Sequence, residues 1–296
     1  MTKTAAKRKG RKAEPIVYII IIVITAAFFL FNTFPFLEGV FYSFTDWKGY
    51  GDWKFVGWNN YKNLFIDESI LHSYKFTIGF AVICTILVNI LSLILACALN
   101  AKIKWKNMLK AIYFLPYMLG SLIVGFIFNF IFSTLLPQFG KAMGIDFLSR
   151  NILGTNYAVW GIIIVTVWSS VAFNTLIYIA GLQGIDTQIY EAAALDGAVG
   201  FTRFRKITFP LLASSFTVNM VLAAKGYLMV YDQIMAMTNG GPGELTTSIS
   251  VLIYKKGFSQ GQFALQSANA VVLFLLIAII SFTQMKILEH REEKME

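Results

Sequence analysis

Residues 190–210 read YEAAALDGAVGFTRFRKITFP and separate two apolar stretches of the chain. The segment is too polar to span a bilayer, and its Gly and Pro fall in a pattern that a plain linker does not need. Strong helix formers fill QIYEAAAL, and Asp186 or Thr187 supplies an N-cap before them. Asp196-Gly197 is a stop signal, because Gly adopts the left-handed conformation that ends many helices. We therefore expect a compact helix-turn-helix elbow here.

The second half of the elbow is expected to form another short helix. It begins near Thr202 and carries Phe201 and Phe204 on one face. Pro210 disfavours helical geometry at Phe209, so the chain is expected to reset there before the next apolar stretch.

Two interpretations of the elbow remain open. It lies in lipid headgroups, with its Arg and Lys side chains towards anionic phosphates, or it docks on a protein partner. The second is favoured, because the elbow lacks a continuous apolar face and Glu191 has no use at a negatively charged surface.

Composition indicates a membrane protein. Of 296 residues, 57% are hydrophobic and 14% charged, and the mean hydropathy is +0.64, which leaves too few charges to cover a soluble globule. The formal charge of +9 does not indicate nucleic-acid binding, because the basic residues form short runs beside apolar segments.

Cysteine and histidine usage predicts neither a disulfide nor a metal site. Cys84 and Cys97 lie in one apolar stretch, about 20 Å apart on a helix and out of disulfide reach. His72 and His290 have no Cys or His neighbours at ligand spacing, so no zinc site is expected.

Six apolar segments approach or exceed the length that crosses a bilayer. We expect an all-α transmembrane fold, one domain at 16–287 between a basic tail at 1–15 and a second tail at 288–296. The elbow occupies 182–211. The six expected spans are 16–37, 75–99, 111–133, 157–181, 212–236 and 266–287. The first could be a signal peptide, but its apolar run is too long and no cleavage site follows it.

Basic residues predict the orientation. They concentrate on one side of six spans, which places both termini and the elbow in the cytoplasm. They are Lys3, Lys7, Arg8, Lys9, Arg11, Lys12, Lys102, Lys104, Lys106, Lys110, Arg203, Arg205, Lys206, Lys286, Arg291 and Lys294. Trp47, Trp53 and Trp58 fall in an opposite loop, where an interfacial aromatic belt is favoured over ligand binding. Pro116 is expected to kink the third span.

The spacing Glu191-Ala192-Ala193, three residues, Gly197, nine residues, Ile207, one residue, Phe209-Pro210 resembles a known signature. It is the EAA signature of bacterial binding-protein-dependent ABC importer permeases, with Phe209 where Leu is usual. FTDWKGYGDWKFVGWNNYKNLF at 44–65 and TNGGPGELTTSISVLIYKKGFSQGQFALQSANA at 238–270 are similar to loops of the sugar-type, maltose-transporter-like branch. The resemblance covers nearly the whole chain.

The resemblance implies a type I importer permease in a bacterial cell membrane. Its elbow would be the coupling helix that sits in a groove of a cytoplasmic ATPase. Other implied partners are a second homologous permease and an extracytoplasmic solute-binding protein. The chain has no Walker A motif, so ATP and Mg²⁺ would bind the ATPase and no cofactor would bind here. The expected coupling residues are Glu191, Ala192, Ala193, Gly197, Phe201, Phe204, Ile207 and Pro210.

Polar residues within spans are candidates for the solute path, because they are costly to bury. The candidates are Lys225, Asn219, Asp232, Asn174, Asn129 and Asn89. Bonding between helices is the commoner use of such Asn residues. Lys225 and Asp232 are seven residues apart and share a face of one expected helix. They contact the solute, or they join a polar network through a neighbouring span. A third alternative is that Asp232 lies near the outer membrane surface. The Gly-rich turn Asn239-Gly240-Gly241-Pro242-Gly243 is a structural turn or a contact for the binding protein.

Three functions remain open. The first is a sugar or oligosaccharide importer subunit. The second is an ABC permease for a glycerophosphodiester, a polyol or an acidic sugar, for which Lys225 would suit an anion. The third is an ATP-independent transporter, which is disfavoured because inverted repeats and a membrane-embedded chain of Asp, Glu or His are missing from the sequence.

Overall fold

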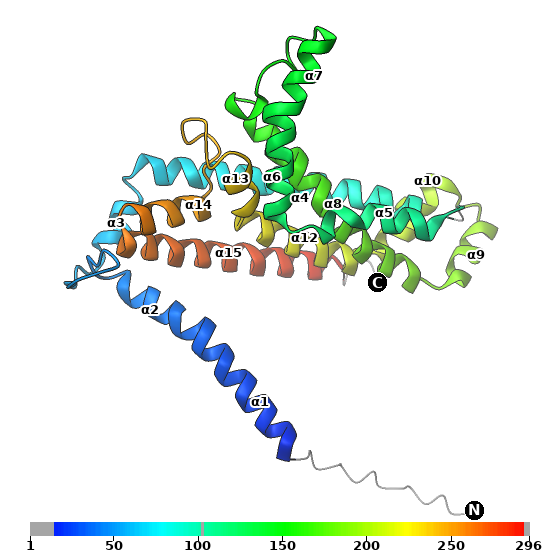
Figure 1. Cartoon of the computed structure of the whole chain (residues 1–296). Coiled ribbons are helices and arrows are strands. Elements are labelled where there is room, and N and C mark those ends of the chain that lie inside the picture. Colours follow the sequence, from blue (N-terminus) through cyan, green and yellow to red (C-terminus); the bar gives the residue numbers. More distant parts are fainter. Residues whose placement is uncertain (1–14, 102–103, 293–296) are drawn as a thin grey trace, which may run out of the picture.

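The computed structural model of the chain describes residues 15–101 and 104–292 and consists of helices joined by turns (Figure 1). In these ranges the one β-type pairing is an isolated antiparallel bridge between Thr45 and Phe55. The basic residues up to position 14, Lys102 and Lys294 lie outside the described residues. The prediction of an all-α membrane fold is confirmed.

The elements follow one another in chain order, with η marking π-helical turns and, for η3, a 3₁₀ turn. The first part contains α1 (Pro15–Phe28), η1 (Phe29–Thr33), α2 (Phe34–Tyr42), α3 (Asn59–Leu64), α4 (Glu68–Asn100), α5 (Lys106–Met118), α6 (Ser121–Phe130), η2 (Ile131–Leu135), α7 (Leu136–Met143) and η3 (Ile152–Gly154). The second part contains α8 (Ala158–Gly184), α9 (Thr187–Leu195), α10 (Gly200–Arg203), η4 (Phe204–Thr208), α11 (Phe209–Leu211), α12 (Ala213–Leu228), α13 (Asp232–Met237), α14 (Ile249–Tyr254), η5 (Lys255–Ser259) and α15 (Phe263–Glu292).

Five helical runs in the described part of the chain are long and apolar enough to cross a membrane. They are Ile16–Tyr42, Glu68–Asn100, Ser121–Met143, Ala158–Gly184 and Phe263–His290. A sixth span exists if Gly200–Leu211 and Ala213–Leu228 are counted together, with a bend of 69° between them.

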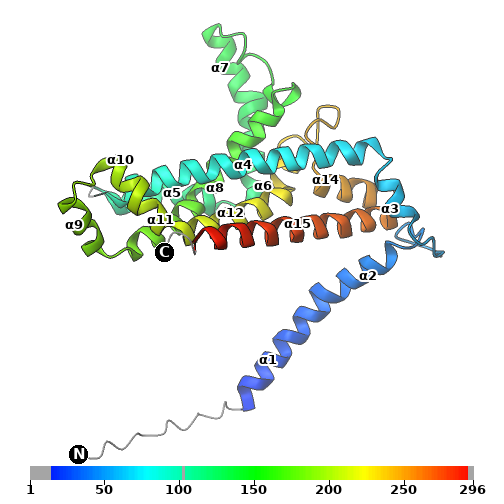
Figure 2. The same ribbon diagram turned by 180° about the vertical axis from the view of Figure 1, so that it is seen from behind.

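The core lies where α4, α8, α12 and α15 pack along one another (Figures 1 and 2). Phe80 and Val88 of α4 meet Ile162 and Val171 of α8 and Leu228 of α12, all buried. Lipid tails are as apolar as these side chains, so close van der Waals packing rather than water exclusion stabilises such a bundle.

Polar side chains add bonds between the same helices. The Tyr178 hydroxyl of α8 donates to Asn89 Oδ1 of α4 at 2.7 Å, and Ser92 Oγ of α4 donates to the Val171 carbonyl of α8 at 3.1 Å. These hydrogen bonds fix the register of α4 against α8.

The first span stands apart from this bundle. The apolar window of Ile16–Tyr42 has none of its residues buried, and Figure 1 shows α1 running away from the other helices. Near its C-terminal end, the ring of Phe36 packs on Phe274 of α15 with centroids 5.0 Å apart. The bundle core is therefore built without α1.

The third span differs from the single helix expected at 111–133. Pro116 lies inside α5, which continues to Met118, and the break falls at Leu119 and Gly120, whose ψ angles are 126° and 143°. Gly120 extends at low cost and then accepts from the Val124 N–H to start α6. The proline fits within the helix, and the glycine after it sets the boundary.

The fifth span also differs from the continuous helix expected at 212–236. The α12 helix ends at Leu228, and three non-helical residues, 229–231, precede α13. Ser248 Oγ donates to the Val230 carbonyl at 2.7 Å and thus satisfies a backbone group that the break leaves free. This partner lies 18 residues away, so helical patterning does not reveal it.

The first long loop is closed by two residues of the FVGWNNY stretch. The buried Asn60 Nδ2 donates to the Ser43 carbonyl at 2.8 Å and to the Thr45 carbonyl at 2.7 Å. The Tyr61 hydroxyl lies 2.7 Å from Ser43 Oγ. The motif therefore holds the end of α2 against α3.

An ion pair joins the start of α4 to η5. Asp67 caps α4 by accepting from the Ser69 and Ile70 N–H groups. Lys256 Nζ lies 3.1 Å from Asp67 Oδ2 and also donates to Ser69 Oγ. Burial raises the pKa of Asp67, but these hydrogen bonds and the Lys256 charge outweigh it and hold the pKa below 3.8.

Asp67→Ala is expected to lower the free energy of unfolding by about 1–2 kcal/mol, because both the cap and the ion pair are lost. Asp67→Asn keeps a capping oxygen and should lose less. The depressed pKa means that the stabilisation is present above about pH 4 and disappears as the pH falls through the folded-state value. Thermal unfolding of the purified chain in detergent, compared at pH 7 and pH 3, measures both effects. Equal losses for the two variants would contradict the capping role.

Candidate functional site

The predicted elbow begins with the cap that the sequence indicated. Asp186 is the N-cap of α9, and its Oδ1 accepts from the Gln188 N–H at 2.9 Å. The helix runs from Thr187 to Leu195. Figure 1 shows α9 and α10 together at one end of the bundle, beyond the ends of α8 and α12.

Gly197 ends α9 in a Schellman turn. Its φ is +76°, the Ala198 N–H donates to the Ala193 carbonyl at 2.8 Å, and the Gly197 N–H donates to the Ala194 carbonyl at 3.1 Å. A Cβ added at Gly197 would meet nothing within 4 Å. The requirement for glycine is therefore one of backbone conformation and not of space.

The second half of the elbow is helical for longer than expected. It begins at Gly200, two residues before Thr202, and continues without a break to Leu211. The expected reset at Phe209 is wrong: its φ and ψ are −67° and −43°, and the chain turns only at Leu212. The reason is the π-helical turn η4, in which the Phe209 N–H bonds to the Phe204 carbonyl, so a helical position before Pro210 is accommodated.

A contact that sequence analysis missed ties the two halves together. The Arg203 guanidinium carbon lies 5.5 Å from the ring centroid of Tyr190. Such a cation–π contact contributes about 0.5–1 kcal/mol at an exposed site. The thirteen-residue separation follows from the Gly197 turn and matches no helical spacing.

An exposed apolar patch covers the tip of the elbow. Leu195 is 90% exposed, Val199 65% and Phe201 75%. Glu191 and Asp196 are exposed in the same segment, and Glu191 forms no ion pair with any residue that the structure describes. Apolar side chains beside unpaired carboxylates fit a partner that is both apolar and basic at this point.

The other predicted coupling residues divide between the surface and the fold. Ala192 is exposed and Ala193 is buried under its own turn, while Phe204, Ile207 and Pro210 are half-buried. The Phe204 ring packs against Phe201 at 6.3 Å and Phe209 at 6.1 Å. These residues join the exposed patch to α12.

The Asn candidates for the solute path are bonded within the bundle. Asn219 Nδ2 donates to the Asn174 carbonyl at 3.1 Å, and Asn174 Nδ2 donates to the Ser170 carbonyl at 3.0 Å. Asn129 Nδ2 donates to the Met237 carbonyl at 2.5 Å, so it links α6 to the end of α13. Helix-to-helix bonding therefore accounts for Asn129 and Asn219.

Lys225 and Asp232 do not share a helix face. Lys225 lies in α12 and Asp232 begins α13, on opposite sides of the 229–231 break. Both are exposed in the single chain. A seven-residue spacing places two side chains on one face only in an unbroken helix. Because the helix is broken at 229–231, the prediction of a shared face is wrong.

The Gly-rich turn is a firmly bonded structure. Thr246 Oγ1 donates to the Gly241 carbonyl at 2.7 Å, Thr247 Oγ1 donates to the Gly240 carbonyl at 3.0 Å, and Lys255 Nζ donates to the Asn239 carbonyl. A shallow hollow of about 140 Å³ lies beside it. Pro242 and Gly243 complete the turn, and Gly243 is exposed.

Metal binding finds no support in the arrangement of side chains. Over 15–101 and 104–292, no group of three or more His, Cys, Asp or Glu residues could hold a metal ion.

Comparison with known proteins gives one family. Residues 88–294 match the family described as "Binding-protein-dependent transport system inner membrane component". The "Multiple sugar-binding transport system permease protein MsmF" of Streptococcus mutans is 39% identical over 260 residues, 87% of this chain and 90% of that protein. The "Probable starch degradation products transport system permease protein AmyD" of Thermoanaerobacterium thermosulfurigenes is 36% identical over 261 residues, 88% of this chain and 89% of that protein.

The fold has a close solved counterpart. A chain of a bacterial alginate ABC transporter, solved in complex with an alginate pentasaccharide-bound periplasmic protein, has a TM-score of 0.78. The match covers 91% of this chain and 92% of that chain at 20% identity, so the likeness concerns the fold.

Gly197→Val is expected to loosen the elbow while the bundle stays folded. A side chain with a β-branch at φ +76° costs about 1–2 kcal/mol, whereas Asn tolerates this region. Hydrogen–deuterium exchange of the purified chain should therefore rise at residues 193–198 in Gly197→Val and change little in Gly197→Asn. Identical exchange in the wild type and Gly197→Val would show that the turn does not depend on this conformation.

Proposed function

We propose, from the premise that this chain belongs to the family of binding-protein-dependent transport system inner membrane components, that it forms half of the path of an ATP-driven sugar importer. The solute would be a sugar or oligosaccharide delivered by an extracytoplasmic binding protein. The names of the two bacterial relatives, which concern multiple sugars and starch degradation products, support this solute class. The alginate transporter, which has the same fold, was solved with a periplasmic protein that carries an alginate pentasaccharide, and this supports delivery by a binding protein.

The observation that carries the mechanism is the exposed patch at the tip of the elbow. Leu195, Val199 and Phe201 offer an apolar contact, and the Schellman turn at Gly197 makes the projection compact. We expect this patch to sit in a groove of a cytoplasmic ATPase, which binds ATP and Mg²⁺. Closure of two ATPase subunits would then move α12 and α8 as rigid bodies.

The remaining partners follow from the same proposal. A second, homologous permease would complete the path and face the bundle of this chain. The basic tails and the elbow would lie in the cytoplasm of a bacterial cell, and the Gly-rich turn at 239–243 would face the binding protein. The opposite ends that the elbow and α14 occupy in Figure 1 are consistent with this arrangement.

A second solute class is favoured by one residue. Lys225 is exposed in α12, and no carboxylate that the structure describes pairs with it. An ammonium group within a span is costly unless it meets a charge or water. If Lys225 faces the path, an acidic sugar is a suitable solute, and a glycerophosphodiester meets the same requirement.

Phe201→Asp is expected to release the ATPase and to reduce ATP-driven uptake more than tenfold, because it places a charge in the apolar patch. Uptake is measured in vesicles that carry the full complex, with a panel of radiolabelled glucosyl, galactosyl, fructosyl and uronic-acid oligosaccharides. Phe65→Asp is the matched control, since Phe65 is 71% exposed at the far end of the bundle and should leave ATPase co-purification unchanged. Sugar uptake that needs no ATPase, or a Phe201→Asp complex that retains it, would refute the coupling role.

Lys225→Gln tests the second solute class. It is expected to slow uptake of the uronic-acid oligosaccharides by roughly tenfold and to leave the uncharged sugars unaffected, because only the acidic solutes lose a charge partner. Equal rates for wild type and variant on all acidic members of the panel would assign Lys225 a role away from the solute.

A further inference from the structure

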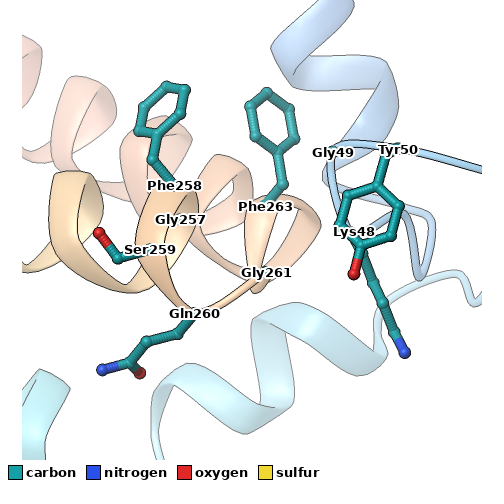
Figure 3. A pocket seen from close by; sticks show the side chains of 9 residues that line it. All are labelled: Lys48, Gly49, Tyr50, Gly257, Phe258, Ser259, Gln260, Gly261 and Phe263. Atoms are coloured by element: carbon teal, nitrogen blue, oxygen red, sulfur yellow. The ribbon is translucent and has the colours of Figure 1, made fainter.

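A hollow of about 460 Å³ lies beside the start of α15, at the end of the bundle opposite α9 and α10 (Figures 1 and 3). One wall is the loop with Lys48 and Tyr50, and the other is the segment from Gly257 to Phe263. Figure 3 shows the rings of Phe258 and Phe263 projecting to one side of their segment and Gln260 to the other. The volume of the hollow is in the range of small-molecule sites, and none of its lining residues belongs to the elbow.

Aromatic rings continue from this hollow in an unbroken row. The row consists of Trp47, Phe263, Phe258, Tyr254 and Tyr231. Successive ring centroids are 4.9, 6.0, 5.7 and 5.6 Å apart. The spacing is within the range of aromatic contacts, so each ring fixes the position of the next.

The row ends at the break in the fifth span. Tyr231 is the last of the three non-helical residues before α13, and the Ser248 hydroxyl holds the adjacent Val230 carbonyl. Irregular backbone at membrane depth is tolerated where it is buried in protein or lines a water-filled cavity. Val230 is buried but Tyr231 is only partly so, and the latter ring therefore stands at the open side of the break.

The rings in the middle of the row are accessible. Tyr254 is 45% exposed and Phe258 70%, whereas Tyr178 and Tyr227 in the core are 0% and 7% exposed. Hydrogen-bonding groups lie on the other side of the same segment: Gln260 points away from the two Phe rings, and Ser259 and Lys48 line the hollow with it. A purely lipid-facing belt has no need of these polar groups around one cavity.

We propose that the hollow and the aromatic row form an acceptor track for pyranose rings. One pyranose lies in the hollow, where its hydroxyls bond to Gln260, Ser259 and Lys48. The apolar face of the next pyranose of the oligosaccharide stacks on Phe258 and Tyr254, on the other side of the segment. The track leads from the hollow to the break at 229–231. This inference rests on the proposed sugar function and adds to it a site that the elbow and the polar path candidates do not supply.

The test is Phe258→Leu in the full transport complex, reconstituted with its binding protein and supplied with the best wild-type sugar of the panel above. Leu preserves the apolar volume and removes the stacking face. At saturating loaded binding protein, uptake is expected to fall by about three- to tenfold. Phe258→Tyr should restore it, and combining Tyr254→Leu with Phe258→Leu should deepen the loss.

Phe65→Leu is the matched control, because Phe65 is as exposed as Phe258 but lies outside the row. Its uptake should equal that of the wild type. Uptake by Phe258→Leu at the wild-type rate would overturn the track. So would an unchanged maximal rate with a higher half-saturating concentration of binding protein, since that result assigns the hollow to docking. A wild-type complex that imports no sugar of the panel would refute the proposed function itself, which is a different outcome.

Discussion

The structure depends on one constraint: within lipid, every backbone N–H and C=O must find a partner inside the protein. An unbroken helix meets it internally, as α4 and α8 do. The fifth span does not, because residues 229–231 leave its helical ladder. Ser248 Oγ donates a hydrogen bond to the Val230 carbonyl, and Asn129 Nδ2 donates one to the Met237 carbonyl, where α13 ends. The position of α14 and α6 is thus fixed by what the broken span requires.

A related requirement applies to side chains, because a polar side chain buried in a membrane bundle also needs a partner. Asn89 receives the Tyr178 hydroxyl, and Asn219 donates to the backbone of α8 at Asn174. Each bond joins two spans, so α4, α8 and α12 resist sliding past one another. A bundle pinned in this way transmits a displacement as a unit, which suits a subunit that is moved from outside.

Local signals were sufficient for the first half of the elbow and for the class of fold. Asp186 caps α9 and Gly197 ends it because both effects act within one turn. The sequence could not locate the ends of the third and fifth spans in the same way. Gly120, rather than Pro116, sets the first boundary, and the second depends on Ser248 from a distant loop. The Tyr190–Arg203 contact was also hidden, since it exists only after the Gly197 turn has formed.

The elbow precedes α12 and the break at 229–231 follows it, so one helix connects the two. The segment Gly200–Leu211 enters α12 through a bend of 69°, and α12 runs for 16 residues, about 24 Å, to Leu228. A partner that shifts the elbow therefore acts directly on the N-terminal end of α12. Beyond the bend at Leu212, the next place along the chain that could absorb this displacement as rotation is 229–231, because those residues have left the helical ladder. Tyr231 moves with that segment, whereas Tyr254 belongs to α14, which is held by the Ser248 bond and by contacts with α4 and α15. In the proposed mechanism, movement at the elbow would thus change the geometry where the aromatic row meets the span, at the opposite end of α12.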